Sequence, residues 1–569
     1  MAKIKPERAA AKEEISSFAG MGGHASPNGN AAADCCNFRI CGDGSLEKRS
    51  GWSVKREFMD PVQAVWVGTV GGERLHLVVS GDIVFLVQDG YNKNVGILTG
   101  IVNDVHFLHY GDALYLLTGS QIWVWRSNLK KMEKVVPYVP LFGHNWHPTS
   151  YGDVNEPINL LTRCLRVHYR NTTATASFML PFFAESVEMV RVDGKSVTDF
   201  YLHGGGDMVQ IPSAANGTVV EVAFTMAYST DLADQLASCT KGFVSTDDGE
   251  ESAFLFGASQ GYRLFPSRTV TTSMKNYCHV FYPTVDPVYF CEDDLLNPGD
   301  AQNPIRALCR QYGRLMIFCD HGVHWAERDK EIGLWQSYPL FSGIGCAGES
   351  CVIPYEQDLL VFQKGGLYRM NATASNPESA RLTCLSGEVA EHLAEMTTDI
   401  CMWLERSRQE VWIRDPKSNG STVWVYHIPE KKWYRFDGIP ASFFLEWDGD
   451  VGFAWNRFLC LMREEDVTDN GSPFTAYYQS GYSPLVTPQK VKRTLRAVLW
   501  GATADNLLRL HLQTEQRSKE LLLQGSNREA PHVFDCRVSL GRFRFLRYRL
   551  TVTGVSRPRI YGISFYSNL

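Results

Sequence analysis

Two histidines and two acidic turns carry side-chain types that could bind a metal ion. His144 and His147 lie three residues apart in a loop that also contains Asp153. The turns at residues 247–251 and 292–294 each hold several carboxylates, whose oxygens suit Ca²⁺. A polar loop and solvated hairpin tips explain the same residues without a metal, and no CxxC pair accompanies them. The sequence therefore predicts no metal site and no cofactor.

Catalytic signatures are mostly absent from the chain. There is no HExxH, GxSxG or GxxxxGK[ST] motif, and no GxGxxG that opens a helix. Residues 245–249 partly match the Ser-x-Asp-x-Gly turn of propeller sialidases, but the aromatic residue that should close this turn is missing. A glycosidase also needs two facing carboxylates or a tyrosine nucleophile. The sequence thus predicts that the protein is not an enzyme, and a propeller glycosidase is the less favoured alternative.

Positive charge is concentrated at the C-terminal end. Residues 487–569 contain fifteen Lys or Arg and five Asp or Glu, about +10 in a chain whose net charge is -6. Arg542, Arg544, Arg547 and Arg549 follow one another in GRFRFLRYRL, two on each face if this strand is regular. Two interpretations remain open. The cluster forms a solvated face that docks on an acidic partner or on the chain's own acidic propeller, or it faces nucleic-acid phosphates.

Short apolar strands separated by Gly, Asp and Asn turns begin at about residue 62 and dominate the rest of the chain. One sequence pattern recurs, in which a short strand and a tight turn are followed by a second strand rich in Trp or Tyr. Its copies lie at residues 111–125, 313–327, 357–370 and 409–427. The later copies are separated by roughly 40 to 50 residues, the size of one four-stranded blade. The chain is therefore predicted to be all-β, with a β-propeller of about five to seven blades.

Breaks in this repeat predict the domain organisation. Residues 1–34 are rich in Gly, Ala and Asn and are expected to form a flexible arm that orders only on a partner. Alternating strands around an Asp193-Gly194 turn predict an inserted β-sandwich. The predicted parts are the arm, the first propeller part at 35–154, the inserted sandwich at 155–230, the remaining propeller at 231–480 and a basic C-terminal β-sandwich at 481–569.

Composition excludes several classes of protein. The 569 residues are 44% hydrophobic and 21% charged, which is typical of a globular chain rather than a disordered or fibrous one. No run of about 18 apolar residues occurs, so no membrane span is expected. The fifteen cysteines lie mostly in apolar runs and are expected to be buried thiols in a reducing compartment.

The stretch CNFRICGDGSLEKRSGW at residues 36–52 resembles the opening of virion proteins from tailed bacteriophages. In those proteins an Asn-containing strand leads to a Gly-x-Leu-x-Lys-Arg-x-Gly-aromatic pattern. The matching residues here are Gly44, Leu46, Lys48, Arg49, Gly51 and Trp52. Within this class the sequence resembles the tail hub or nozzle proteins of short-tailed phages, also called packaged-DNA stabilisation proteins. The resemblance covers most of residues 36–460 and rests on short motifs.

The resemblance implies a structural component of the virion tail, made in the host cytoplasm. Its copies would form a homo-oligomeric ring, expected to be a hexamer, that contacts the adaptor, the portal and the tail fibres. The ring would line part of the DNA channel, touch packaged DNA transiently, and help to retain and deliver the genome. Arg542, Arg544, Arg547 and Arg549 would then contact a neighbouring subunit or face the DNA.

A receptor-binding or glycan-binding propeller is the alternative. Aromatic residues of the repeats, including Trp125, Trp325 and Trp424, could form a platform on which sugars stack. Packing between blades explains them more simply, because they recur at the same place in each repeat.

Overall fold

The computed structural model describes most of the chain, and the fold is read from the described residues. These are residues 10–22, 31–100, 104–148, 152–173, 175–247, 249–258, 261–279, 281–282, 284–329, 331, 333–363, 365–373, 376–396, 400–418, 420–485, 488–502, 507–524 and 531–568.

Strands make up most of this structure, which confirms the predicted all-β class. The helices within the described ranges are short: α1 (Asp231–Ala237), α2 (Thr272–His279), α3 (Ala390–Leu393) and the 3-10 turns η1 (Glu292–Asp294), η2 (Glu349–Cys351) and η3 (Gly387–Val389). No helix in the described part of the chain has the length and apolar character that crossing a membrane requires. The chain divides into two compact units, one of residues 63–345 and one of residues 1–62 and 346–569.

Residues 63–345 contain four antiparallel sheets in which each strand pairs with the next along the chain. Alternating apolar residues and tight turns build them; at Gly111, for example, φ is +57° and the turn sets Tyr110 opposite Ala113. The strands are β6 (Val62–Val70), β7 (Glu73–Ser80), β8 (Ile83–Gln88) and β9 (Tyr91–Ile97); β10 (His106–Tyr110), β11 (Ala113–Leu117), β12 (Ile122–Arg126) and β13 (Lys131–Lys134); β23 (Lys241–Asp247), β24 (Glu250–Phe256) and β25 (Phe265–Pro266); and β26 (Ile305–Gln311), β27 (Arg314–Cys319), β28 (Gly322–Arg328) and β29 (Trp335–Ser342).

Between the second and third of these sheets, the same unit contains two sheets that share one core. Phe178 and Val209 of the smaller sheet pack in the same buried cluster as Val167 and Phe224 of the larger one. The larger sheet joins β15 (Val154–Asn155), β14 (Leu141–His144), β16 (Cys164–Arg170), β22 (Val219–Met226), β18 (Ala184–Val192) and β19 (Lys195–Val197), and the smaller joins β17 (Ser177–Met179), β21 (Met208–Gln210) and β20 (Tyr201–Leu202).

The other unit contains three further four-stranded arrays. The last array is completed by a strand from far away in the sequence, because β5 pairs with β40 and sets Glu57 opposite Phe458. The arrays are β30 (Val352–Tyr355), β31 (Asp358–Gln363), β32 (Gly366–Thr373) and β33 (Asn376–Cys384); β34 (Cys401–Glu405), β35 (Glu410–Arg414), β36 (Val423–His427) and β37 (Lys432–Phe436); and β38 (Phe443–Trp447), β39 (Asp450–Trp455), β40 (Phe458–Met462) and β5 (Ser53–Glu57).

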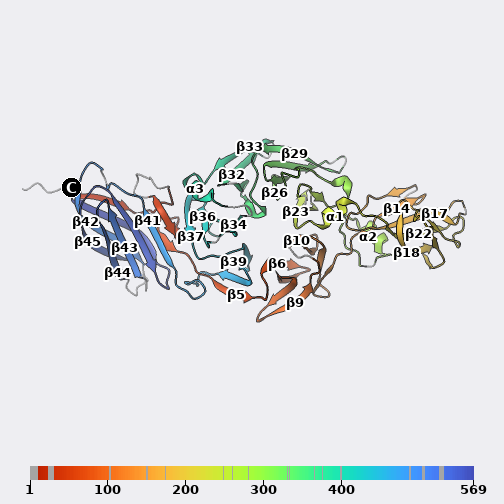
Figure 1. Ribbon diagram of the computed structural model, residues 1–569, viewed down its shortest axis with the longest axis horizontal. Coiled ribbons are helices and arrows are strands. Elements are labelled where there is room, and N and C mark those ends of the chain that lie inside the picture. Colours follow the sequence, from red (N-terminus) through yellow and green to blue (C-terminus); the bar gives the residue numbers. More distant parts are fainter. Residues whose placement is uncertain are drawn as a thin grey trace, which may run out of the picture. The chain divides into compact units, whose positions relative to one another are not determined.

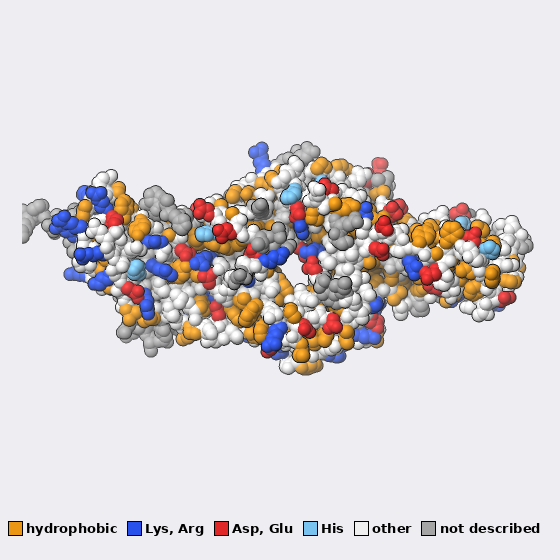
Figure 2. Space-filling view, in the orientation of Figure 1, with side chains coloured by type: hydrophobic (Ala, Val, Ile, Leu, Met, Phe, Trp, Pro, Cys, Tyr) orange, Lys and Arg blue, Asp and Glu red, His pale blue; other side chains and the backbone are white. Residues whose placement is uncertain are grey.

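The C-terminal strands form two facing sheets in this unit (Figure 1). Tyr548 of one sheet and Phe565 of the other have ring centroids 5.3 Å apart in the shared core. The nine-stranded sheet continues from β34–β37 through β2 (Ala32–Cys36), β41 (Thr475–Ser480), β46 (Leu546–Thr553), β43 (Leu507–Thr514) and β44 (Ser518–Gln524). The six-stranded sheet joins β3 (Phe38–Ile40), β4 (Leu46–Lys48), β47 (Arg559–Asn568), β42 (Lys492–Ala502) and β45 (His532–Phe543), with β1 (Ala10–Ile15) on β47. Figure 2 shows Lys and Arg gathered over this part of the surface.

Strand β1 and the first half of β2 lie in residues 1–34, for which the composition predicted an arm that orders on a partner. In the structure the chain itself supplies pairing strands: β1 pairs with β47, and β2 lies between β37 and β41. Ile15 and Phe18 are buried there, so this Gly-rich segment carries enough apolar surface to anchor its described part. Residues 1–9 and 23–30 lie outside the described residues.

Candidate functional site

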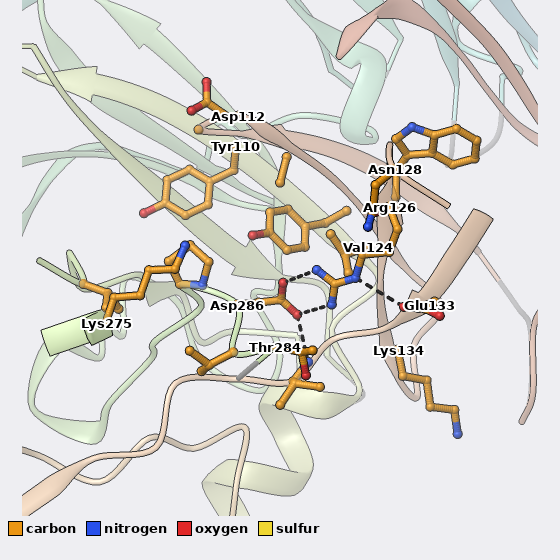
Figure 3. A pocket seen from close by; sticks show the side chains of 18 of the residues that line it. Tyr110, Asp112, Val124, Arg126, Asn128, Glu133, Lys134, Lys275, Thr284 and Asp286 are labelled. Atoms are coloured by element: carbon orange, nitrogen blue, oxygen red, sulfur yellow. Dashed lines mark hydrogen bonds and ion pairs between the residues drawn. The ribbon is translucent and has the colours of Figure 1, made fainter. Parts of the chain in front are cut away.

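A pocket in the unit of residues 63–345 is the candidate site (Figure 3). Its volume is about 730 Å³, and its walls come from the sheet β10–β13, from α2 and from residues 284–287. Pockets of roughly 300–1,000 Å³ hold most small ligands. The turns of the sheet and the end of α2 thus bring polar side chains from distant parts of the sequence to one cavity.

Arg126 and Asp286 form the fixed polar centre of the pocket. The terminal nitrogens of Arg126 donate to the two oxygens of Asp286 at 2.6 and 2.8 Å. Asp286 is 5% exposed and also accepts the backbone N–H of Val136 at 2.9 Å. The hydrogen bond to Asp286 raises the pKa of Arg126 above its ordinary value. A bidentate pair of this kind holds both side chains in one orientation.

Glu133 extends this polar centre. One carboxylate oxygen of Glu133 lies 3.5 Å from Nε of Arg126, and the other lies 2.6 Å from the ammonium group of Lys131. The hydrogen bond to Lys131 lowers the pKa of Glu133. The Glu133 carboxylate is therefore ionised at neutral pH, and the carboxylates of Glu133 and Asp286 both contact cationic side chains.

Two tyrosines lie beside this pair. The rings of Tyr110 and Tyr115 have centroids 6.4 Å apart, and Ser267 donates to the Tyr110 hydroxyl at 3.2 Å. Burial raises the pKa of both phenols, so both hydroxyls stay protonated at neutral pH. Lys275 lies on the opposite side of the pocket from Arg126 and Glu133 (Figure 3). The cavity therefore offers aromatic surface together with hydrogen-bond donors and acceptors.

The residues of the phage-like motif lie elsewhere, in the unit with the two facing sheets. Gly44 has φ +77°, and a Cβ there would lie 2.2 Å from Oγ of Ser17. A Cβ on Gly51 would lie 2.0 Å from the carbonyl oxygen of Thr468. Leu46 is fully buried. The motif glycines are thus required by close backbone approach.

Trp52 ends the motif and packs against the sheet that β5 completes. Its ring lies 5.4 Å from that of Phe453 and 5.8 Å from that of Trp455, both edge to face. Its indole N–H donates to the carbonyl of Gly438 at 2.8 Å. The aromatic residue of the motif therefore anchors the N-terminal segment to the neighbouring strands.

Lys48 and Arg49 are buried cations of the same motif. Arg49 donates to both carboxylate oxygens of Asp469, at 2.8 and 2.6 Å, and to the carbonyl of Asp437 at 2.6 Å. Lys48 donates to the carbonyl of Gly554 at 2.7 Å. The Lys48 ammonium lies 4.0 Å and the Arg49 guanidinium 3.9 Å from the centroid of the Phe474 ring. These residues join the N-terminal segment to loops from residues 437–554.

The four predicted patch arginines do not share one strand. Strand β45 ends at Phe543 and β46 begins at Leu546, because Glu515 accepts the backbone N–H groups of Arg544 and Phe545 at 2.9 and 2.8 Å. Arg542 therefore belongs to the six-stranded sheet, whereas Arg547 and Arg549 belong to the nine-stranded sheet. The prediction that one regular strand carries two of these arginines on each face is therefore wrong, because the chain turns between Phe543 and Leu546.

The environments of these arginines differ as well. Arg547 lies 5.6 Å from the ring of Tyr482 and donates to the carbonyl of Ser480 at 3.3 Å. The Arg549 guanidinium lies 3.8 Å from the centroid of the Tyr477 ring. Arg542 and Arg544 are exposed. Two of the four thus pack within the chain, and two face solvent.

The residues singled out for metal chemistry have other contacts. Asp153 accepts the backbone N–H of Asn145 at 2.6 Å, and the ring of His144 stacks on Tyr169 at 5.2 Å. In the acidic turns, Asp294 binds Arg268 and Glu250 binds Arg328 at 2.8 Å. Asp248 lies outside the described residues. Within the described ranges, no group of three or more His, Cys, Asp or Glu side chains could hold a metal ion.

Sequence reasoning missed the central pair of the pocket. Arg126 and Asp286 are 160 positions apart, and Asp286 follows no recognisable motif. Arg126 directly follows the tryptophans of the repeat copy at residues 111–125. No local spacing signals this pair, since the fold alone brings the two residues together.

Comparisons with known proteins yield no family. No family model and no curated protein matches the chain. Solved structures that resemble it include the AfRom2 CNH domain, with a TM-score of 0.37, 6% identity, and 73% of this chain and 99% of that chain covered. A glycoside hydrolase has a TM-score of 0.23, 10% identity, and coverage of 89% and 98%. An exo-β-1,3-galactanase from Phanerochaete chrysosporium has a TM-score of 0.17, 10% identity, and coverage of 83% and 97%.

These similarities correct one expectation. Glycoside hydrolases among the similar structures contradict the prediction that the protein is not an enzyme, and this prediction is not retained. At TM-scores below 0.5, the similarities carry no argument for a particular activity. None of the three descriptions names a virion protein.

Proposed function

We propose that this protein is a structural component of a bacteriophage tail, in the hub or nozzle ring below the portal and adaptor. One observation carries the proposal: the motif that resembles phage virion proteins coincides with the residues that tie the N-terminal segment into the fold. Gly44, Lys48, Arg49, Gly51 and Trp52 are held by close packing or buried hydrogen bonds. A motif with this placement is structural, as the resemblance requires.

The same proposal includes a β-propeller. Its blades would be antiparallel arrays of the kind that each unit contains, such as β6–β9 in residues 63–345 and β30–β33 in the other unit. The pairing of β5 with β40 supports this, because a strand from the N-terminal part of the chain completes the last array. In propellers in general, such pairing leaves only short, protected strand edges.

The proposed hexameric ring is tested by imaging the full chain, alone and with the adaptor–portal complex of the same phage, by negative stain and mass photometry. Arg542 and Arg544 are the exposed candidates for the subunit contact. The double change R542E and R544E is expected to abolish the ring, whereas R457E, at an exposed arginine 2.7 Å from Glu57, should leave it intact. A chain that stays monomeric with the complex contradicts the proposal.

We propose glycan binding as the second candidate function. The observation that favours it is the pocket on β10–β13, which combines the rings of Tyr110 and Tyr115 with the Arg126–Asp286 pair. A glycan array probed with the full chain tests it. Reproducible binding to a defined set of sugars supports this function, and an array without signal contradicts it.

A further inference from the structure

We infer that the pocket on β10–β13 selects an uncharged saccharide over an acidic one. This inference rests on the second candidate function, glycan binding, and specifies which class of saccharide the pocket prefers. The charges that line the pocket carry the argument. The lining cations are Arg126, Lys134 and Lys275, and the lining anions are Asp112, Glu133, Glu251 and Asp286.

The positive charge of Arg126 is already balanced by carboxylates of the protein. Both terminal nitrogens of Arg126 bind Asp286, and its Nε faces Glu133 at 3.5 Å. A ligand carboxylate or phosphate would have to compete with these carboxylates for Arg126. It would also lie among more anions than cations, an arrangement that disfavours a further negative charge.

The remaining groups match sugar hydroxyls. Each hydroxyl can donate one hydrogen bond and accept two, so it needs donors and acceptors side by side. The Asn128 amide and the Lys275 ammonium supply donors, the Asp112 carboxylate accepts, and the Tyr110 hydroxyl does both. The ring of Tyr110 adds an apolar surface for the C–H face of a sugar.

The pocket is also held in place before any ligand binds. The Arg126–Asp286 pair links β12 to residues 284–287, and the Asp286 side chain is fixed further by the Val136 N–H. Glu251 accepts the backbone N–H of Gly111 at 2.9 Å and so holds the β10–β11 turn at the rim. Fixed polar groups bind a ligand with less loss of conformational entropy.

The test uses the full chain and a panel of matched oligosaccharides. Neutral probes end in glucose, galactose or mannose, and acidic probes carry sialic acid or glucuronic acid on the same cores. Isothermal titration is expected to give tighter binding for a neutral probe than for its acidic counterpart. N128A and K275A should each weaken that binding about three- to tenfold, the loss of one hydrogen bond. The matched control K195A, at an exposed lysine of β19, should not change it.

The outcomes separate the inference from the function on which it rests. Tighter binding of acidic probes overturns the inference and leaves glycan binding standing. Neutral binding that is unchanged in both N128A and K275A places the site elsewhere and also overturns the inference. If none of the probes binds, the second candidate function, glycan binding, is itself contradicted. Arg126 and Asp286 are left unchanged in this test because their pair also joins two parts of the fold.

Discussion

At the scale of single residues, Arg49 joins the N-terminal segment to Asp469 through a buried ion pair. Its side chain is fully buried, and Asp469, at 12% side-chain exposure, faces it at 2.6 Å. R49M leaves the Asp469 carboxylate buried without its cation, so we expect a loss of about 3–5 kcal/mol in the free energy of unfolding. Urea unfolding monitored by tryptophan fluorescence measures it. R457M breaks an exposed pair and should cost less than about 1 kcal/mol; equal losses in the two variants would contradict this role.

Lys48 makes the free energy of unfolding depend on pH, because its pKa differs between the folded and the unfolded chain. Burial lowers its pKa from 10.5 to about 8. Between these values the unfolded chain binds a proton that the folded chain has released, so the contribution of Lys48 to stability increases as pH rises from about 8 to about 10.5. Buried tyrosines and cysteines act in the opposite direction, so the comparison must be with K48M. Urea midpoints of both proteins at pH 7.5, 9 and 10.5 test this. A difference that does not change with pH would contradict it.

At the scale of the elements, β1 covers one edge of β47. Its pairing runs from Ala10 opposite Asn568 to Ile15 opposite Ile563. Deletion of residues 1–15 is expected to speed hydrogen exchange of the β47 amides at 563–568, because amides that bonded to β1 face water. Mass spectrometry of peptic peptides measures this. Deletion of residues 1–9 leaves β1 intact and serves as the control. Unchanged exchange after the longer deletion would show that β1 does not protect β47.

At the scale of the whole molecule, the two units differ in how they use the chain. Residues 63–345 are continuous, whereas the other unit needs residues 1–62 together with 346–569. A fragment of residues 62–345 is therefore expected to fold alone and to unfold cooperatively when heated. A fragment of residues 346–569 should aggregate, because β2, β4 and β5 are missing from its sheets, and co-expression with residues 1–61 should restore solubility. Circular dichroism and size-exclusion chromatography measure both. A soluble, cooperatively melting 346–569 fragment would contradict the prediction.

The sequence by itself determined the local architecture. Alternating apolar residues and turns such as Asp193-Gly194 predicted antiparallel strands, and the structure has the turn there, with φ +47° and +74°. Such features follow from neighbours in the chain, because side chains alternate along a strand and only a few residues tolerate a positive φ.

The tertiary structure alone decided which distant segments meet. Nothing near Cys36 in the sequence indicates that its strand lies between β37 and β41, and nothing near Arg126 indicates Asp286. The sequence from Arg542 to Arg549 predicts one strand. In the structure, Glu515 accepts backbone N–H groups of Arg544 and Phe545 and so stabilises a turn within this segment. These outcomes depend on shared burial and hydrogen bonding between segments tens to hundreds of residues apart. Local spacing does not encode such pairings, since any apolar strand edge of suitable length could serve as a partner.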